Sequence, residues 1–280
     1  MQSMDYAPQA TSAPISQSKA TATMPSVRFM VNDAWKYAKA NWALAIWFVG
    51  VSLLSLVLFV FTSTFIFSVL FTLNLTGLWL MLPLSIVFTL AAVVLSVLNV
   101  GAVLYAVTSV SQISYWQGFT LAWTNKWSLI AMYVLIAVAT VGGFMALVVP
   151  VVAVGVYLSI APIVCARESC SPVASLNRSW QLVSGHWWKF FVRLFYVGLG
   201  VAFVDFILSY IAEMTGVIGG LVQMLVSAFI LVFVLRILVV WYEFFLHKGS
   251  AYTSQHNWWL LSVLLLGVLG ILLLAVLYLV

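Results

Sequence analysis

The longest charge-free interval in the chain determines its fold class. Positions 40–125, between Lys39 and Lys126, contain no Asp, Glu, Lys or Arg. A membrane-spanning helix needs about 20 apolar residues, so this interval is long enough for more than one span. The whole chain agrees, because 65% of its 280 residues are hydrophobic, only 6% are charged and its mean hydropathy is +1.18. This composition excludes a soluble domain, which carries roughly 25% charged residues, and predicts an all-α, multi-pass membrane protein.

Turn-forming residues divide the apolar sequence into spans. The segment 71–77 contains Asn, Thr and Gly, which favour a turn. The stretch 128–165 is interrupted by Gly142-Gly143 and Pro150, so it holds either two short helices that turn near Pro150 or one span with a re-entrant piece. We favour the two helices, because they keep the basic segment 167–189 on the charged side. The predicted spans are 43–70, 78–109, 128–148, 150–165, 190–212, 217–244 and 257–280, a transmembrane bundle of seven, or of six if 128–165 crosses once.

The basic residues predict the orientation of this bundle. With seven spans they gather on one side, and the turns near 71–77, 147–151 and 212–217 on the other side contain no Lys or Arg. Because basic loops stay in the cytoplasm, the charged side and the N-terminus are expected to be cytoplasmic. The C-terminus then lies outside with seven spans and in the cytoplasm with six. The basic residues on the charged side are Arg28, Lys36, Lys39, Lys126, Arg167, Arg178, Lys189, Arg193 and Lys248.

Residues 1–27 differ from the rest of the chain. They are rich in Ser, Thr, Ala, Gln and Pro and lack an apolar core, which predicts a disordered tail and no cleavable signal peptide. Residues 28–280 are expected to form a single helical membrane domain. The formal net charge of +5 accompanies no nucleic-acid-binding pattern, so the expected partners are the lipid bilayer and either a membrane-protein partner or a second copy of the chain.

Pairs of aromatic residues recur just before predicted spans. Trp35 and Trp42 are seven positions apart, as are Trp180 and Trp187, and this spacing places both rings on one helix face. Such rings prefer the headgroup region, so they either anchor the ends of the spans or belong to cytoplasmic surface helices that sense lipid or dock a partner. The predicted interfacial anchors are Trp35, Trp42, Trp123, Trp127, Trp180, Trp187, Trp188, Trp258 and Trp259.

Two segments are predicted to be amphipathic interfacial helices on the cytoplasmic side. In 28–42 an apolar side adjoins a polar arc, and in 171–188 Ser171 is the expected N-cap, Pro172 suits the first helical position and Gly185 ends the helix. The apolar side of the first holds Val31, Trp35, Ala38 and Trp42, and its polar arc holds Asn32, Asp33, Lys36 and Lys39. The apolar stripe of the second holds Val173, Leu176, Trp180 and Val183.

Four ionisable residues fall within or at the ends of the last long spans: Asp205, Glu213, Arg236 and Glu243. An ionisable group in hydrocarbon is costly unless it is paired or hydrated, so each is a candidate functional residue. Asp205 is either a proton or cation site or a hydrogen-bonding brace to another helix. Arg236 lies near the opposite end of its own span, so we expect it to snorkel to the inner surface or to meet Glu168 or Glu243.

No catalytic or metal-binding pattern accompanies these residues. Cys165 and Cys170 have neither zinc-site nor redox spacing, and no two of His186, His247 and His256 have the i, i+4 spacing of a helical metal pair. Nucleophile elbows, phosphate-binding glycine loops and paired carboxylates are missing from the sequence. We therefore expect no enzymatic activity, no metal site and no cofactor.

A run of motifs fills the sequence between Pro150 and Phe191, after an apolar stretch with a Pro turn. The motifs are Ala161-Pro-Ile-Val164, Arg167-Glu168, Ser171-Pro172, Ser175, Ser179-Trp-Gln-Leu-Val-Ser-Gly185 and Trp187-Trp188, with Ala34-Trp35 and Asn41-Trp42 near the start. Together they resemble the membrane domain found on some glycerophosphodiester phosphodiesterases and its stand-alone relatives, mostly uncharacterised bacterial inner-membrane proteins. The likeness covers residues 28–247 in loose pattern and is specific around 160–190.

The resemblance implies a helical module of the bacterial inner membrane, with an envelope- or lipid-related role and no assigned catalytic residues. The phosphodiesterase catalytic domain has no counterpart in these residues, so its activity is not expected, and the span 257–280 departs from the family pattern. The sequence thus predicts a non-enzymatic protein that organises lipids or protein partners through its interfacial helices. The alternatives are a small transporter or channel that uses Asp205 and Arg236, and an obligate subunit of a larger membrane complex.

Overall fold

The structure, a computed structural model, describes residues 25–71, 75–109, 112–145 and 148–247, and four single positions at 262, 265, 267 and 268. These residues are helical, with short turns and no strand among them, as the sequence predicts. The helices are α1 (Val27–Ala40), α2 (Trp42–Phe71), α3 (Leu75–Thr108), α4 (Tyr115–Thr124), α5 (Lys126–Met145), α6 (Val148–Leu158), α7 (Ala161–Glu168), α8 (Pro172–Ser184), α9 (Trp187–Thr215) and α10 (Val217–His247).

Four helical segments in the described part of the chain are long and apolar enough to cross a membrane: Trp42–Thr62, Ser85–Thr108, Trp187–Thr215 and Val217–His247. A fifth arises if α4 and the segment Lys126–Gly142, which meet at 82°, form one bent span. The chain is therefore a multi-pass helical membrane protein with four to five candidate spans. The predicted count of six or seven is not confirmed, and the span predicted at 257–280 lies outside the described residues.

The stretch 128–165 forms a helical hairpin followed by a break. Helices α5 and α6 pack against each other, and Pro150 is the third residue of α6, whereas residues 146 and 147 between the two helices lie outside the described part of the chain. Helix α6 has 11 residues and is about 17 Å long, well short of the roughly 30 Å of membrane hydrocarbon. The predicted span 150–165 is not one continuous helix. Pro162 lies in the first turn of α7, where its missing N–H and its ring stop α6 from continuing.

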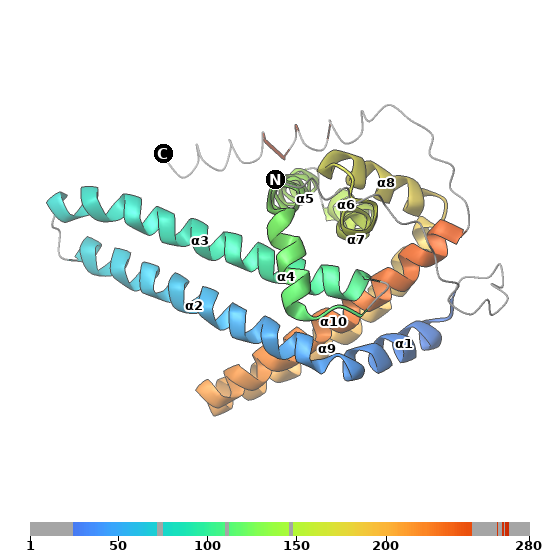
Figure 1. The fold of residues 1–280 in the computed structure, drawn as a ribbon, viewed down its shortest axis with the longest axis horizontal. Coiled ribbons are helices and arrows are strands. Elements are labelled where there is room, and N and C mark those ends of the chain that lie inside the picture. The colour runs from blue at the N-terminus through green and yellow to red at the C-terminus, as the bar shows by residue number, and fades with distance from the viewer. Residues whose placement is uncertain are drawn as a thin grey trace, which may run out of the picture.

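The long helices form two hairpins that meet at a common base (Figure 1). Helices α2 and α3 form one arm, α9 and α10 form the other, and the α9–α10 arm also contacts α2 and α3. Helix α9 buries only Phe190, close to its start, and the buried residues of α10 lie mainly between Val232 and Phe245. The main hydrophobic core thus lies at one end, where the start of α9 and the second half of α10 pack with α1, the second half of α3, and helices α4 to α8.

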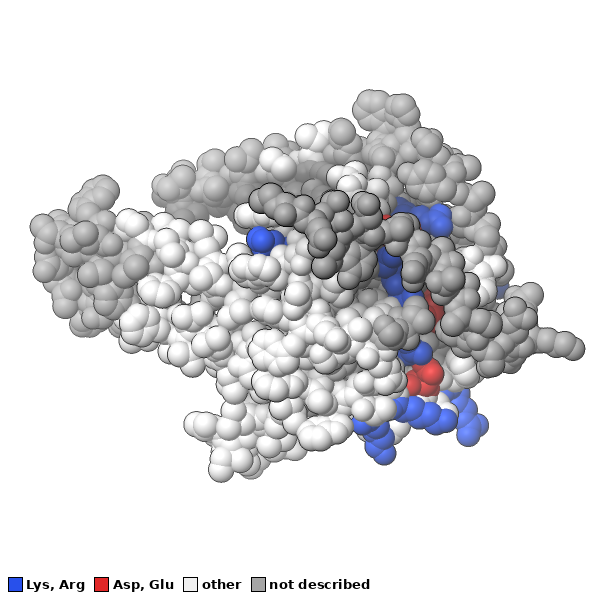
Figure 2. All heavy atoms as spheres, in the orientation of Figure 1, with Lys and Arg blue, Asp and Glu red and all other residues white. Residues whose placement is uncertain are grey.

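Most charged residues lie at this same end, which we call the charged end. Figure 2 shows, on the face in view, that most blue and red atoms gather beside α1 and the adjoining ends of α9 and α10. The basic residues on these helix segments are Arg28, Lys36, Lys39, Arg167, Arg178, Lys189, Arg193 and Arg236, and the acidic residues are Asp33, Glu168 and Glu243.

Helix α1 is a short amphipathic helix, as predicted, and of the predicted apolar side only Ala38 is buried within the protein. Met30, Ala34 and Ala38 are buried, whereas Val31 and Trp35 are exposed. Helix α1 packs against α10, and the small side chains of Ala34 and Ala38 on its buried face favour a close approach of helices. Ser26 caps the helix, because its hydroxyl accepts a hydrogen bond from the Phe29 N–H at 3.2 Å.

Helix α8 begins as the sequence predicts. The Ser171 hydroxyl accepts a hydrogen bond from the Ala174 N–H at 3.3 Å, and Pro172 is the first helical residue. Leu176 and Val183 of the predicted stripe are buried, whereas Val173 is 44% exposed. Because α8 contacts α5, α6, α7, α9 and α10, it packs within the charged end and does not lie alone on a membrane surface.

Candidate functional site

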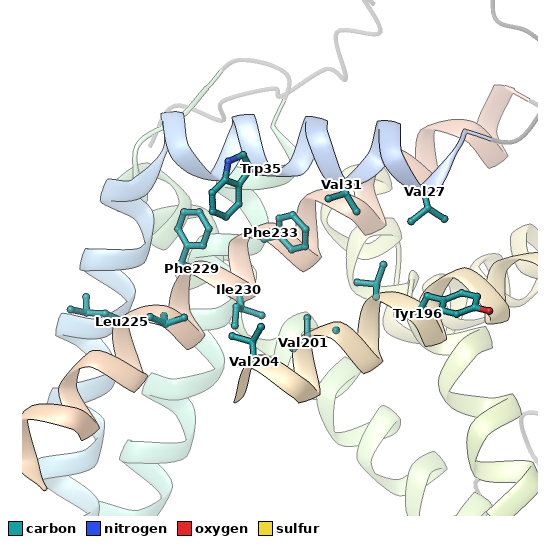
Figure 3. A pocket seen from close by; sticks show the side chains of 13 residues that line it. Val27, Val31, Trp35, Tyr196, Val201, Val204, Leu225, Phe229, Ile230 and Phe233 are labelled. Atoms are coloured by element: carbon teal, nitrogen blue, oxygen red, sulfur yellow. The ribbon is translucent and has the colours of Figure 1, made fainter. Parts of the chain in front are cut away.

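An apolar groove with a volume of about 750 Å³ lies between α1, α9 and α10 (Figure 3). Helix α1 lies across one side of it, and the α9–α10 hairpin forms the other sides. The lining residues are Val27, Val31 and Trp35 of α1, Tyr196, Val197, Gly200, Val201 and Val204 of α9, and Leu225, Val226, Phe229, Ile230 and Phe233 of α10. We call this cavity the groove below.

Helical spacing explains why these residues share one hollow. Val27, Val31 and Trp35 follow one another at intervals of four, which places them on one face of α1 beside the buried face. Gly200 contributes no side chain, and a Cβ added there would have no neighbour within 4 Å, so the groove is open at this point of α9. The ring of Trp35 meets the ring of Phe229 edge to face, with 5.4 Å between the centroids, and thereby closes one end (Figure 3).

Polar contacts hold α1 over the groove. The Arg236 Nε donates to Asp33 Oδ2 at 2.9 Å, and the same guanidinium lies 5.0 Å from the centroid of the Tyr37 ring. The Tyr37 hydroxyl donates to the Ala106 carbonyl at 3.3 Å, and burial raises the pKa of this phenol above its ordinary value. Arg193 Nη1 donates to the Pro25 carbonyl at 2.6 Å. Helix α1 is therefore fastened to α3, α9 and α10.

The partner of Arg236 is neither of the two carboxylates, Glu168 and Glu243, that the sequence analysis named as an alternative to snorkelling towards the inner surface. Those two carboxylates are engaged elsewhere, because Arg167 binds Glu243 at 3.2 Å and Arg178 binds Glu168 at 3.6 Å. The expectation of a Glu168 or Glu243 partner was wrong because it considered only acidic residues near the inner ends of the spans. Helix α1 folds back along α10 and brings Asp33, which the sequence placed only on a polar arc, against Arg236.

Asp205 is joined to the neighbouring helix. The Ser227 hydroxyl on α10 donates to Asp205 Oδ1 at 3.1 Å, and a second contact, from Gln223 to the Ser209 hydroxyl at 2.8 Å, links the same two helices. The sequence analysis named two roles for Asp205, a proton or cation site and a hydrogen-bonding brace to another helix. This geometry fits the brace. Ser227 and Arg236 are nine residues apart on α10, about 14 Å, so Asp205 and Arg236 act in separate places. Glu213 is exposed near the end of α9.

A substitution at Asp205 separates the two roles. Asp205→Asn is expected to preserve stability, because its carbonyl oxygen still accepts from Ser227. Asp205→Ala is expected to lower the free energy of unfolding by about 1 kcal/mol, the usual scale for an interhelical hydrogen bond in a membrane. Thermal unfolding in detergent measures both changes. A proton or ion flux in vesicles that Asp205→Asn abolishes without unfolding the protein would establish transport instead.

The predicted tryptophan anchors divide into two groups. Trp42, Trp123, Trp127 and Trp188 are at least half exposed, and Lys126 lies 4.8 Å above the ring of Trp123. In contrast, Trp180 stacks on Tyr157 with 3.5 Å between centroids. The ring of Trp187 stacks in the same way on Phe191, at 5.2 Å. These two rings therefore pack within the protein, and Trp258 and Trp259 lie outside the described residues.

The described residues contain no group of three or more His, Cys, Asp or Glu that is placed to hold a metal ion. Cys165 and Cys170 are both free thiols, and Cys165 Sγ lies 3.6 Å from the Ser128 hydroxyl. Burial raises the pKa of Cys170 to about 11, so its reactive thiolate form is scarce at neutral pH.

No family model, no curated protein and no solved structure matches this chain. The resemblance drawn from the sequence motifs therefore stays a prediction. The groove was missed by the sequence analysis because its α9 and α10 residues are ordinary apolar residues of a span. Only Val31 and Trp35, named for the apolar side of α1, indicated part of it.

Proposed function

We propose that the protein is a non-enzymatic lipid-binding protein of the bacterial inner membrane, with the charged end on the cytoplasmic side, and that the groove holds the acyl chain of a membrane lipid. The observation that carries this proposal is the groove itself, about 750 Å³ bounded by apolar side chains and covered by α1. Among bilayer components, only hydrocarbon can fill such a space without leaving polar groups unpaired. The resemblance to the phosphodiesterase membrane domains supports a lipid-related role.

The length of the groove supports an acyl chain as its occupant. From Arg193 at the charged end to Val204, helix α9 advances about 17 Å. One leaflet contributes about 15 Å of hydrocarbon, half of the total thickness. A chain that starts beside the basic residues and lies along α9 therefore matches the groove in length.

A transporter based on Asp205 and Arg236 receives less support from the same geometry. Each residue already has a partner, Ser227 and Asp33 respectively, on a neighbouring helix. A shared hydrated path would have to break one of these contacts. The lipid-binding proposal uses the groove as it is and leaves both contacts in place.

The proposal is tested by filling the groove. Gly200→Leu is expected to remove about one retained lipid per protein, because the new side chain enters open space and occupies the position of the acyl chain. Native mass spectrometry of the protein released from its membrane counts the retained lipids. A Cβ added at Gly200 has no neighbour within 4 Å, so the substitution is not expected to disturb helix packing.

The matched control is Gly198→Leu. Gly198 lies on the same helix, also has no neighbour within 4 Å of an added Cβ, and does not line the groove. Gly198→Leu adds the same side chain as Gly200→Leu and raises the helix propensity by the same amount. If both variants retain as many lipids as the original protein, the groove does not hold a lipid and the proposed function is wrong.

A further inference from the structure

The charged end carries more cations than its carboxylates can neutralise. Each of its three acidic residues is already bound to an arginine, in the pairs Asp33–Arg236, Glu168–Arg178 and Glu243–Arg167. Within the described part of the chain, the remaining basic residues of this end have no carboxylate within salt-bridge distance. These residues are Arg28, Lys36, Lys39, Lys189 and Arg193.

Three of these cations lie at one end of the groove. Lys189, Arg193 and Val197 follow at intervals of four on α9, so the two cations continue the same helix face that lines the groove. On α1, Arg28 directly follows Val27, which lines the groove opposite Tyr196 (Figure 3). On each of the two helices, a basic residue therefore lies within one turn of the last apolar residue that lines the groove.

Arg193 is held in position at this end. Its Nη1 donates to the Pro25 carbonyl at 2.6 Å, and the guanidinium lies 5.4 Å from the centroid of the Trp241 ring. A guanidinium has five N–H donors in a rigid plane, and Pro25 engages one of its nitrogens, so further donors remain for an oxygen anion. Lys189, one helical turn before Arg193 on α9, and Arg28, three residues after Pro25, are both exposed.

We propose that the groove selects a phospholipid whose headgroup has a net negative charge, with Arg193, Lys189 and Arg28 binding the headgroup and the apolar walls binding the acyl chain. This inference rests on the proposed lipid site and adds a chemical class of ligand to it. A zwitterionic phospholipid offers the same chain and phosphate, but its own ammonium or choline cation offsets the attraction of the three basic residues. Charge, and not chain chemistry, is what discriminates between the two classes.

The test is a competition between two lipids with the same acyl chains. The full-length protein is equilibrated with an equimolar mixture of phosphatidylglycerol and phosphatidylethanolamine, and native mass spectrometry gives the ratio of the two retained lipids. We expect a preference for phosphatidylglycerol that falls about fivefold in Lys189→Gln and further in Arg28→Gln/Lys189→Gln, since each basic residue near an anionic surface contributes a factor of this order. Lys126→Gln, which removes the same charge beside Trp123 and away from the groove lining, is the control and is expected to leave the ratio unchanged.

Salt gives a second measurement that needs no variant. Raising the ionic strength from about 0.1 M to about 1 M shortens the Debye length from roughly 10 Å to roughly 3 Å, so the preference for phosphatidylglycerol should shrink while total retention persists. Equal retention of both lipids by the original protein would overturn headgroup selection. The lipid site itself would still stand if Gly200→Leu lowers total retention. If Gly200→Leu changes nothing, the proposed function fails together with this inference.

Discussion

Replacing Gly118 with leucine is expected to separate α4 from α3 and to lower the free energy of unfolding by about 3 kcal/mol or more, the upper range for overpacking. A Cβ on Gly118 would overlap the carbonyl oxygen of Ala102, and it would lie 3.2 Å from the carbonyl carbon of the same residue. These are backbone atoms within a helix, so they cannot turn aside as a side chain can. Thermal unfolding of the purified protein in detergent measures the loss.

The same substitution would also break a buried polar network. The Tyr115 hydroxyl donates to Asn99 Oδ1 at 2.5 Å, and Asn99 Nδ2 donates to the Ser52 hydroxyl at 2.8 Å. This chain of contacts connects α4, α3 and α2. Displacing α4 removes Tyr115 from Asn99 and leaves a buried oxygen without its donor, a further cost of about 1–3 kcal/mol.

Gly155→Leu on α6 is the matched control for Gly118→Leu. An added Cβ at Gly155 meets nothing within 4 Å, so this variant is expected to unfold at nearly the same temperature as the original protein. Gly118→Ala should fall between the two, because it introduces the overlapping atom without the larger side chain. Equal unfolding temperatures for Gly118→Leu and Gly155→Leu would show that the packing of α4 against α3 does not require a glycine at position 118.

The sequence predicted those helices and helix ends that are determined by residues close together in the chain. The apolar intervals placed α2, α3, α9 and α10, because a span is defined by its own length and composition. Ser171 and Pro172 placed the start of α8 for the same reason, since a cap acts within one turn. Helix α4 was missed as an element, although its start carries a capping box in which Ser114 and Gln117 each accept from the other's backbone N–H.

The sequence could not show which apolar face of α1 meets protein. Met30, Ala34 and Ala38 form one apolar row, and Val27, Val31 and Trp35 form another beside it. In a membrane both rows can be buried, one in protein and the other in lipid, so hydrophobicity does not distinguish them. The choice depends on where α1 docks, and that contact joins Asp33 to Arg236 across 203 positions of sequence. No pattern within α1 carries this information.

Breaking the Asp33–Arg236 pair is expected to release α1 from the groove. Arg236→Gln removes the charge that holds Asp33 at 2.9 Å and the guanidinium that lies over Tyr37. Both side chains are partly buried, so the expected loss in the free energy of unfolding is about 1–3 kcal/mol, between that of an exposed pair and that of a buried one. Hydrogen exchange should quicken in α1, and lipid retention in the groove should fall because Trp35 no longer closes its end.

A double-mutant cycle separates the pair from the loss of each residue alone. Asp33→Asn and Arg236→Gln each leave one charge without its partner, whereas the double variant leaves two neutral side chains that can still hydrogen-bond. We therefore expect the double variant to be no less stable than Arg236→Gln, with a coupling energy of about 1 kcal/mol between the two sites. If the two losses simply add, the ion pair does not hold α1, and the contacts of Met30, Ala34 and Ala38 with the protein core must hold it instead.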